Sequence, residues 1–247
     1  MRILLLLTWV ILCSGTLAQA QTSSSSATAH VRFSWQNHYA KTVFNLPVYS
    51  NVHGQSYSVS VLRYYVGNIS LHREDGYSHI LPGYHLIVHD DQADDSYQPH
   101  DSIRVSGLPP GTYTSLSFTL GVDSVDNVGG PREGHLDPLL GMYWTWSTGY
   151  IFFKMEGRSS ASPQPKNIIE YHLGGYQAPF NNIQRIRLPL RRPLVAGKDA
   201  ISLEIAFDLG AFVDQDGGID FSLTPSATDV KTAAPFMRRL QGAFHVR

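Results

Sequence analysis

The chain has 247 residues, a formal net charge of -1 with its histidines neutral, and only 16% charged residues. Proteins that bind nucleic acids or anionic lipids carry an excess of basic residues, which this chain lacks. We therefore expect no nucleic-acid partner. The chain also contains 11 histidines. Because histidine is the commonest metal ligand among side chains, metal binding is the first class of function to consider.

The start of the chain has the three-part order of a secretory signal peptide. Met1 and Arg2 provide a charged start, residues 3–12 are apolar, and residues 18–20 have the small-residue pattern of a cleavage site. We therefore expect residues 1–20 to be removed and the mature protein to be periplasmic or secreted. The apolar run is shorter than the roughly 20 residues of a membrane-spanning helix, and no later stretch approaches that length, so no membrane span is expected.

The remainder predicts a single domain made mainly of strands. Residues 21–29 are small and polar and indicate a flexible leader, which leaves one domain over residues 30–247. Strand-like segments alternate with turn signals, which is typical of an all-β antiparallel sandwich. Only residues 233–244 have helical spacing, so we expect at most one or two short helices. The predicted strands cover residues 30–35, 56–71, 83–88, 112–122, 143–155, 166–172, 184–190 and 200–207.

One of these strands carries a clear alternation. Over residues 112–120, Leu116 and Phe118 fall on one face, whereas Ser115 and Ser117 fall on the other. Such a period of two predicts a half-buried strand, with its apolar face in the core and its polar face in solvent.

Residues 141–157, GMYWTWSTGYIFFKMEG, form the segment richest in functional signals. Trp144 and Trp146 share one face of the strand predicted there, because alternate residues of a strand point the same way. Two tryptophans on a strand are most often core residues, so a purely structural role is the first alternative.

This segment resembles the signature of the MbnP-like family of exported copper-binding proteins, the methanobactin-associated periplasmic type. Residues 62–71 (LRYYVGNISL), 84–88 (YHLIV) and 171–175 (YHLGG) resemble further motifs of that family. The resemblance implies a periplasmic β-sandwich that binds copper, in some members through a tryptophan oxidised to kynurenine. It also implies a di-haem peroxidase of the MauG type as the oxidising partner, and an outer-membrane uptake receptor as a further one.

On this resemblance, Trp144 or Trp146 would be the modified residue. The nitrogen of an indole is a donor only, whereas the aromatic amine of kynurenine can offer a lone pair to a soft cation.

The histidines best placed to join such a site are His85 and His172, which lie in family-like segments. His135, on a predicted loop just before the tryptophans, is a third candidate. His85 and His89 share a face of one strand but lie about 13 Å apart, too far to bind one ion, so a site must be assembled from separate segments. Each of these histidines could instead be an ordinary surface or hydrogen-bonded residue.

The leading hypothesis is therefore a non-catalytic copper-binding protein. The sequence has no nucleophile elbow, phosphate loop or zinc-protease motif, and its only cysteine, Cys13, lies in the predicted signal peptide, so we expect no enzyme.

Two other functions stay open. The first is a metal-free secreted β-sandwich interaction module with both tryptophans in its core. The second is a copper oxidase, as in oxidative polysaccharide-cleaving enzymes, whose N-terminal histidine would be His30 after cleavage behind Ala29. That cleavage would leave a polar stretch of about 17 residues after the apolar run, longer than signal peptides usually carry.

Overall fold

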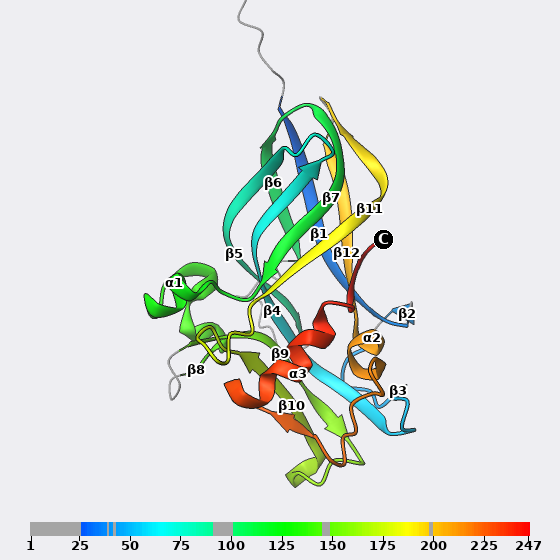
Figure 1. Cartoon of the computed structure of the whole chain (residues 1–247). Coiled ribbons are helices and arrows are strands. Elements are labelled where there is room, and N and C mark those ends of the chain that lie inside the picture. Colours follow the sequence, from blue (N-terminus) through cyan, green and yellow to red (C-terminus); the bar gives the residue numbers. More distant parts are fainter. Residues whose placement is uncertain (1–25, 39, 42, 91–100, 145–148, 198–199) are drawn as a thin grey trace, which may run out of the picture.

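The computed structural model describes residues 26–38, 40–41, 43–90, 101–144, 149–197 and 200–247 (Figure 1). The predicted signal peptide and Trp146 therefore lie outside the described residues. Within the described ranges, no helix combines the length and the apolar character needed to cross a bilayer.

The smaller of two sheets has five strands, in the order β14-β12-β1-β2, with β6 also paired to β1. Strands β1 and β12 run parallel, and the other neighbours run antiparallel. The strands are β1 (Ala27–Asn37), β2 (Ala40–Lys41), β6 (Ser102–Leu108), β12 (Ile201–Asp208) and β14 (Phe244–Val246).

The larger sheet has nine strands, in the order β11-β7-β4-β9-β10-β13, with β3 and β5 paired to β4 and β8 paired to β9. Only β10 and β13 run parallel among these pairs. The strands are β3 (Tyr49–Ser50), β4 (Ser56–Arg73), β5 (Ser78–Asp90), β7 (Gly111–Leu120), β8 (Tyr143–Trp144), β9 (Gly149–Ser159), β10 (Ile168–Gly174), β11 (Gln184–Ala196) and β13 (Ser226–Ala227).

Short helices join or cover the strands. The α-helices are α1 (Ser124–Val128), α2 (Leu209–Asp214) and α3 (Val230–Leu240), and the 3-10 turns are η1 (Gly134–Leu136), η2 (Pro138–Leu140) and η3 (Pro165–Asn167). The expected all-β sandwich is confirmed, although its two parallel strand pairs make both sheets mixed and the described residues form three short α-helices where at most two were expected.

Strand β4 organises the larger sheet. Along one edge it pairs with β5. Along the other edge, residues 57–64 pair with β9 and residues 66–73 pair with β7. The partner therefore changes at Tyr65, and the connection from β7 to β9 begins at this level, where the Gly121 N–H donates to the Tyr65 carbonyl at 3.1 Å.

Aromatic rings fill the space between the sheets. Phe33 of the smaller sheet lies 5.7 Å from Phe118 and 6.3 Å from Tyr64 of the larger sheet, measured between ring centroids. Tyr64 also contacts Phe153, Phe207 and Phe244. Burying each such ring contributes about 1.5–3 kcal/mol, so this cluster is a main source of the stability of the fold.

Several sequence-based predictions differ from the structure in their details. The predicted strand over residues 143–155 is two strands, β8 and β9. Strand β6 was not predicted, because its sequence SIRVSGL is short and contains a glycine. Ala27 and Ala29, assigned to a flexible leader, begin β1 because their small side chains are buried where β6 pairs with β1.

The predicted half-exposed face of β7 is covered. Ser115 and Ser117 are both buried. The guanidinium of Arg187 donates to the Ser115 hydroxyl at 3.0 Å, and His72 Nε2 lies 2.7 Å from the Ser117 hydroxyl. Long polar side chains of neighbouring strands therefore lie over this face, an effect that the alternation within one strand cannot reveal.

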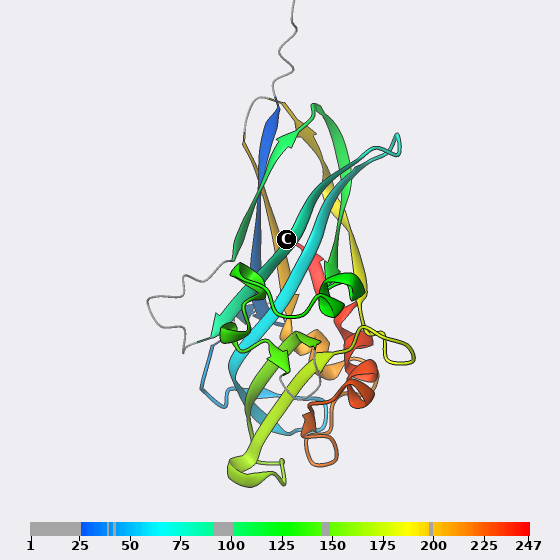
Figure 2. The ribbon, with the colours of Figure 1, turned by 90° about the vertical axis from the view of Figure 1, so that its left-hand side faces the viewer.

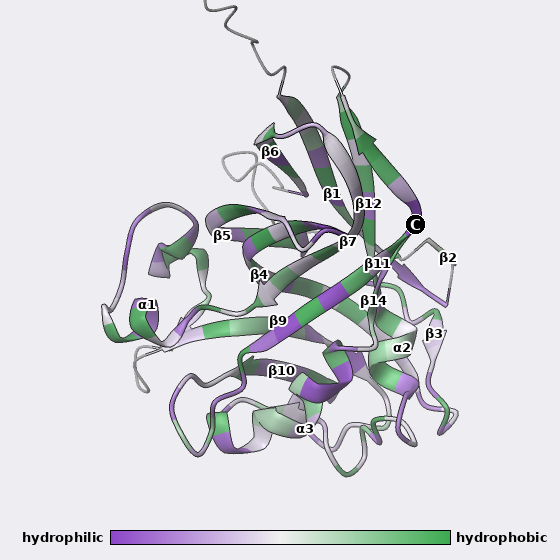
Figure 3. Ribbon diagram, turned by 45° about the horizontal axis from the view of Figure 1, so that its top comes forward, coloured by the Kyte–Doolittle hydropathy of each residue, from purple (hydrophilic) through white to green (hydrophobic). Residues whose placement is uncertain are grey.

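The predicted helix over residues 233–244 corresponds to α3, which begins and ends earlier. The carboxylate of Asp229 accepts from two backbone N–H groups of its first turn, an N-cap that fixes the start. Ala233, Met237 and Leu240 are buried, whereas Phe244 belongs to β14. Figure 3 shows hydrophilic and hydrophobic residues alternating along β11.

Two buried tyrosines give a matched test of this packing. The hydroxyl of Tyr64 has no hydrogen-bond partner within the described part of the chain, whereas the hydroxyl of Tyr171 donates to the Thr224 carbonyl at 2.6 Å. Tyr64→Phe should therefore leave the free energy of unfolding unchanged or raise it by about 1 kcal/mol, and Tyr171→Phe should lower it by about 1–2 kcal/mol. Urea unfolding at pH 7 measures both. Equal losses in the two variants would contradict the expectation for Tyr64.

Candidate metal centre

The connection between β7 and β9 is fixed to the larger sheet by buried hydrogen bonds. The Asn127 amide donates to the Val122 carbonyl at 2.6 Å and accepts from the Tyr150 N–H at 2.9 Å. On the β5 side, the Tyr84 hydroxyl donates to Asp126 at 2.7 Å. These contacts hold α1 and the turns that follow it against the sheets, where Figure 2 shows them facing the viewer.

This connection brings His135 of η1 to His85 of β5. Their ring centroids lie 5.2 Å apart with an angle of 57° between the rings, and both side chains are half-buried. The Leu86 N–H donates to His135 Nδ1 at 3.4 Å. The 3-10 turn therefore lies along the outer edge of β5, and it places two imidazoles from distant parts of the sequence side by side.

The chemistry of this pair is compatible with a metal ion. A single ion bound by two imidazoles at about 2.0 Å each needs ring nitrogens within roughly 4 Å of each other, which rings at this separation can provide. Because His135 Nδ1 accepts the Leu86 N–H, it has a lone pair. The bond is long and therefore weak, so a metal ion could replace it at little cost.

Trp144 belongs to the same connection, in β8. Its side chain is only 4% exposed, and β8 places it opposite Gly149. A Cβ atom on Gly174 would come within 2.8 Å of the Trp144 ring, so this glycine makes room for the indole. Trp144 is thus a buried aromatic residue, as the structural alternative expects.

Tyr150 ties the tryptophan strand to the histidine turn. Tyr150 is the neighbour of Gly149 on β9, and its hydroxyl donates to the Leu136 carbonyl at 2.9 Å. The same hydroxyl accepts from the Arg132 N–H at 3.2 Å. Leu136 follows His135 directly, so the segments that carry Trp144 and His135 are held by one buried side chain.

His172 is not brought to this pair. It lies on β10, and the pairing runs from His172 through Lys154 and Arg63 to Val88 of β5. Three strand spacings separate β10 from β5, about 14 Å, and His85 lies three residues further along β5. His172 Nε2 instead lies 2.8 Å from the carboxylate of Glu156, which also pairs with Lys154 at 3.1 Å.

The other histidines considered have separate surroundings. His89 stacks on Trp35, with ring centroids 5.4 Å apart, so it does not share a site with His85. His30 is exposed in the middle of β1, opposite Ser202 of β12. An amino terminus at His30 would remove the buried Ala27 and Ala29 from the sheet.

Within the described ranges, no group of three or more histidines, cysteines, aspartates or glutamates is placed to hold a metal ion. A metal at His85 and His135 would therefore need a further ligand of another kind. The sequence suggested His135 only as a third candidate. No local pattern could have revealed its contact with His85, because the contact arises from the way the connection folds onto β5.

Comparison with known proteins decides the family. The sequence model of the MbnP family matches residues 28–231, a range that includes the histidine pair and Trp144. The chain belongs to the MbnP family. Its structure is similar to that of MbnP from Methylosinus trichosporium, with a TM-score of 0.50 and 17% sequence identity, covering 82% of this chain and 80% of that chain. At this identity the similarity supports a common MbnP fold. No curated protein sequence matches the chain.

The Glu156 and His172 pair predicts a pH dependence of stability in this MbnP-family protein. The hydrogen bond from His172 lowers the pKa of Glu156 to about 2, with Lys154 assisting and burial opposing. A carboxylate whose pKa is lower in the folded state than in the unfolded state stabilises the fold at pH values above its unfolded pKa of about 4.5. This contribution is lost as the pH falls towards 2. Because the side chain is 32% exposed, the contribution is about 1–2 kcal/mol.

Glu156→Gln should therefore lower the free energy of unfolding by about 1–2 kcal/mol at pH 7, and the difference from the wild type should shrink below pH 4. Urea unfolding at pH 7 and pH 3 measures this change. Glu170→Gln serves as the control, because Glu170 lies opposite Glu156 on β10 and its carboxylate accepts a long bond, 3.4 Å, from Ser226. A difference that is independent of pH would rule out this role for Glu156.

Proposed function

We propose that this protein is a non-catalytic copper-binding protein that holds one copper ion at His85 and His135. The observation that supports the proposal is the close approach of these two rings, 5.2 Å between centroids, on a connection fixed by buried hydrogen bonds. Imidazole nitrogen suits copper well, and a half-buried pair leaves an ion little access to water.

The third ligand would be a kynurenine formed from Trp144 or Trp146. Two molecules of hydrogen peroxide would be the oxidant: the C2–C3 bond of the indole breaks, each of these carbons gains one oxygen and two waters are released, and hydrolysis by a further water then releases C2 as formate. The product has a free aromatic amine with a lone pair, which the indole lacks. A di-haem peroxidase of the MauG type would be the oxidising partner. The link through Tyr150 favours Trp144, because it ties the strand of Trp144 to the turn that carries His135.

The protein would act in copper acquisition or homeostasis in the periplasm or outside the cell, after removal of the signal peptide, with an outer-membrane uptake receptor as a further partner. His172 would serve the fold through Glu156 rather than bind the metal, since a neighbouring Lys154 ammonium disfavours a second cation. The metal-free interaction module remains the competing function.

Histidine substitutions separate these functions. His85→Ala and His135→Ala should each weaken copper(I) binding by about 100-fold or more, because each removes a proposed ligand. Competition with a coloured copper(I) chelator measures the affinity. His172→Ala is the matched control and should leave the affinity within about threefold, since it lies outside the pair. An equal loss in His172→Ala, or no loss in any variant, would refute this ligand set.

Mass spectrometry tests the modified tryptophan. Mature protein purified from the envelope of its own host should carry one copper and an added mass of about 4 Da, the net effect of losing one carbon and gaining one oxygen. Trp144→Phe should abolish the added mass and Trp146→Phe should retain it.

An unmodified, metal-free mass that does not change on adding copper(I) would leave the interaction module as the function. Sequencing of the mature amino terminus addresses the remaining possibility, because a copper oxidase of the kind described would begin at His30.

A further inference from the structure

A groove runs over the outer face of the smaller sheet, away from the histidine pair. Its middle is a cavity of about 500 Å³. This cavity shares Arg32, Glu204 and Arg247 with a cavity of about 400 Å³ at one end, and Ser202, Leu203 and Arg247 with a cavity of about 340 Å³ at the other. The shared residues place the three cavities next to one another, and we call them together the β1–β12 groove.

The charges along the β1–β12 groove are unbalanced. Arg32 pairs with Asp101 at 3.2 Å, and Arg247 pairs with Glu204 at 3.0 Å, so these two guanidiniums are neutralised. Arg191 and Arg192 line the far end of the groove, and both are exposed.

The excess of positive charge is local. Neither Arg191 nor Arg192 forms an ion pair with another described residue. The far end of the groove therefore carries an excess of positive charge, although the net charge of the chain is -1.

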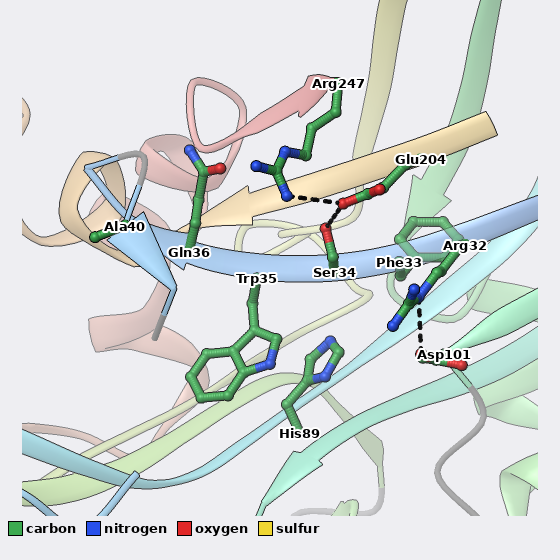
Figure 4. A pocket seen from close by; sticks show the side chains of 10 residues that line it. All are labelled: Arg32, Phe33, Ser34, Trp35, Gln36, Ala40, His89, Asp101, Glu204 and Arg247. Carbon is green, nitrogen blue, oxygen red and sulfur yellow. Dashed lines mark hydrogen bonds and ion pairs between the residues drawn. The ribbon is translucent and has the colours of Figure 1, made fainter. Parts of the chain in front are cut away.

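The other end of the groove is an aromatic pocket. Figure 4 shows His89 beside Trp35 on one side of β1, and Ser34 with Glu204 and Arg247 on the other. His89 Nε2 is buried, and no hydrogen-bond partner for it lies in the described parts of the chain. Burial, assisted by Arg32, lowers the pKa of His89 to about 3, so the imidazole is neutral at neutral pH. A buried polar atom without a partner calls for a water or a ligand group.

The backbone of β1 is also open beside this pocket. The pairing of β6 with β1 ends at Arg32, and the pairing of β2 with β1 begins at Gln36. The Phe33 N–H still donates to the Asp101 carbonyl at 2.5 Å. Among the described residues, no strand pairs with this edge of β1 over Ser34 and Trp35, which an extended chain could approach.

We infer that the β1–β12 groove binds an acidic, extended peptide segment of a partner protein. The guanidinium N–H groups of Arg191 and Arg192 can donate hydrogen bonds to the carboxylates of such a segment. Its amide groups would meet Glu204 and the hydroxyl of Ser202, and a side chain at its end would reach the edge of β1 beside Trp35. A flat anionic membrane fits less well, because it could not enter the recess.

A labelled hexaglutamate peptide tests this inference with the mature protein. Fluorescence anisotropy at low salt measures its binding. The double substitution Arg191→Gln with Arg192→Gln should weaken binding by about fivefold, the effect of removing two exposed charge contacts. The matched control is Arg158→Gln with Lys166→Gln, which removes the same charge from a separate cavity and should leave binding unchanged. The indole N–H resonance of Trp35, assigned through Trp35→Phe, should shift on binding.

Several results would overturn the inference. Equal weakening by the two double variants would mean that only net charge matters. Tighter binding of a heparin fragment or of phosphatidylglycerol vesicles, with the same dependence on Arg191 and Arg192, would identify a polysaccharide or a membrane as the occupant. Failure of the peptide to bind at low salt would exclude an acidic segment. None of these results depends on copper, so the outcome is separate from that for the histidine pair.

Discussion

The change of partner along β4 is the constraint on which the proposed copper site depends. Strand β4 pairs with β5 on one edge, but on the other edge its partner changes from β9 to β7 at Tyr65. The chain between β7 and β9 must therefore fold at that level. Because His85 lies opposite Val66, only one residue beyond this change, a connection folded there can carry His135 to it. The backbone pairing, rather than any local motif, brings the two histidines together.

Aromatic packing and buried hydrogen bonds stabilise different parts of this arrangement. The rings around Tyr64 hold the two sheets together, whereas Asn127 and Tyr150 fix the connection by hydrogen bonds that are removed from water. Hydrogen bonds of this kind are directional, so they fix positions more sharply than apolar packing does. A pair of histidines mounted on them is preorganised for a ligand, which lowers the cost of ordering the site when an ion arrives.

The sequence predicts much of this fold because alternating side chains and turn residues act over a few positions. It also identifies the family, since the motif around Trp144 is long and specific. It cannot predict features that depend on distant partners. Ala27 looks like part of a leader until β6 is found to pair with it, and Ser117 looks exposed until His72 is found over it. The sequence motifs favour His172 over His135 as the partner of His85, whereas His135 is the residue in contact with it. The reason is the same, because the order of the strands is not encoded locally.

The parallel pairing of β1 with β12 has a further consequence for how the protein reaches its folded state. Gln36 and Asp208, which these strands bring together, are 172 residues apart. Contacts of such long range form late and slowly, whereas β4 and β5 are neighbours in sequence and can form a hairpin early. A folding chain would complete the β4–β5 hairpin with His85 first and the smaller sheet only once nearly all of its length is present. The two halves of the molecule, one with the histidine pair and one with the groove, would thus mature in sequence.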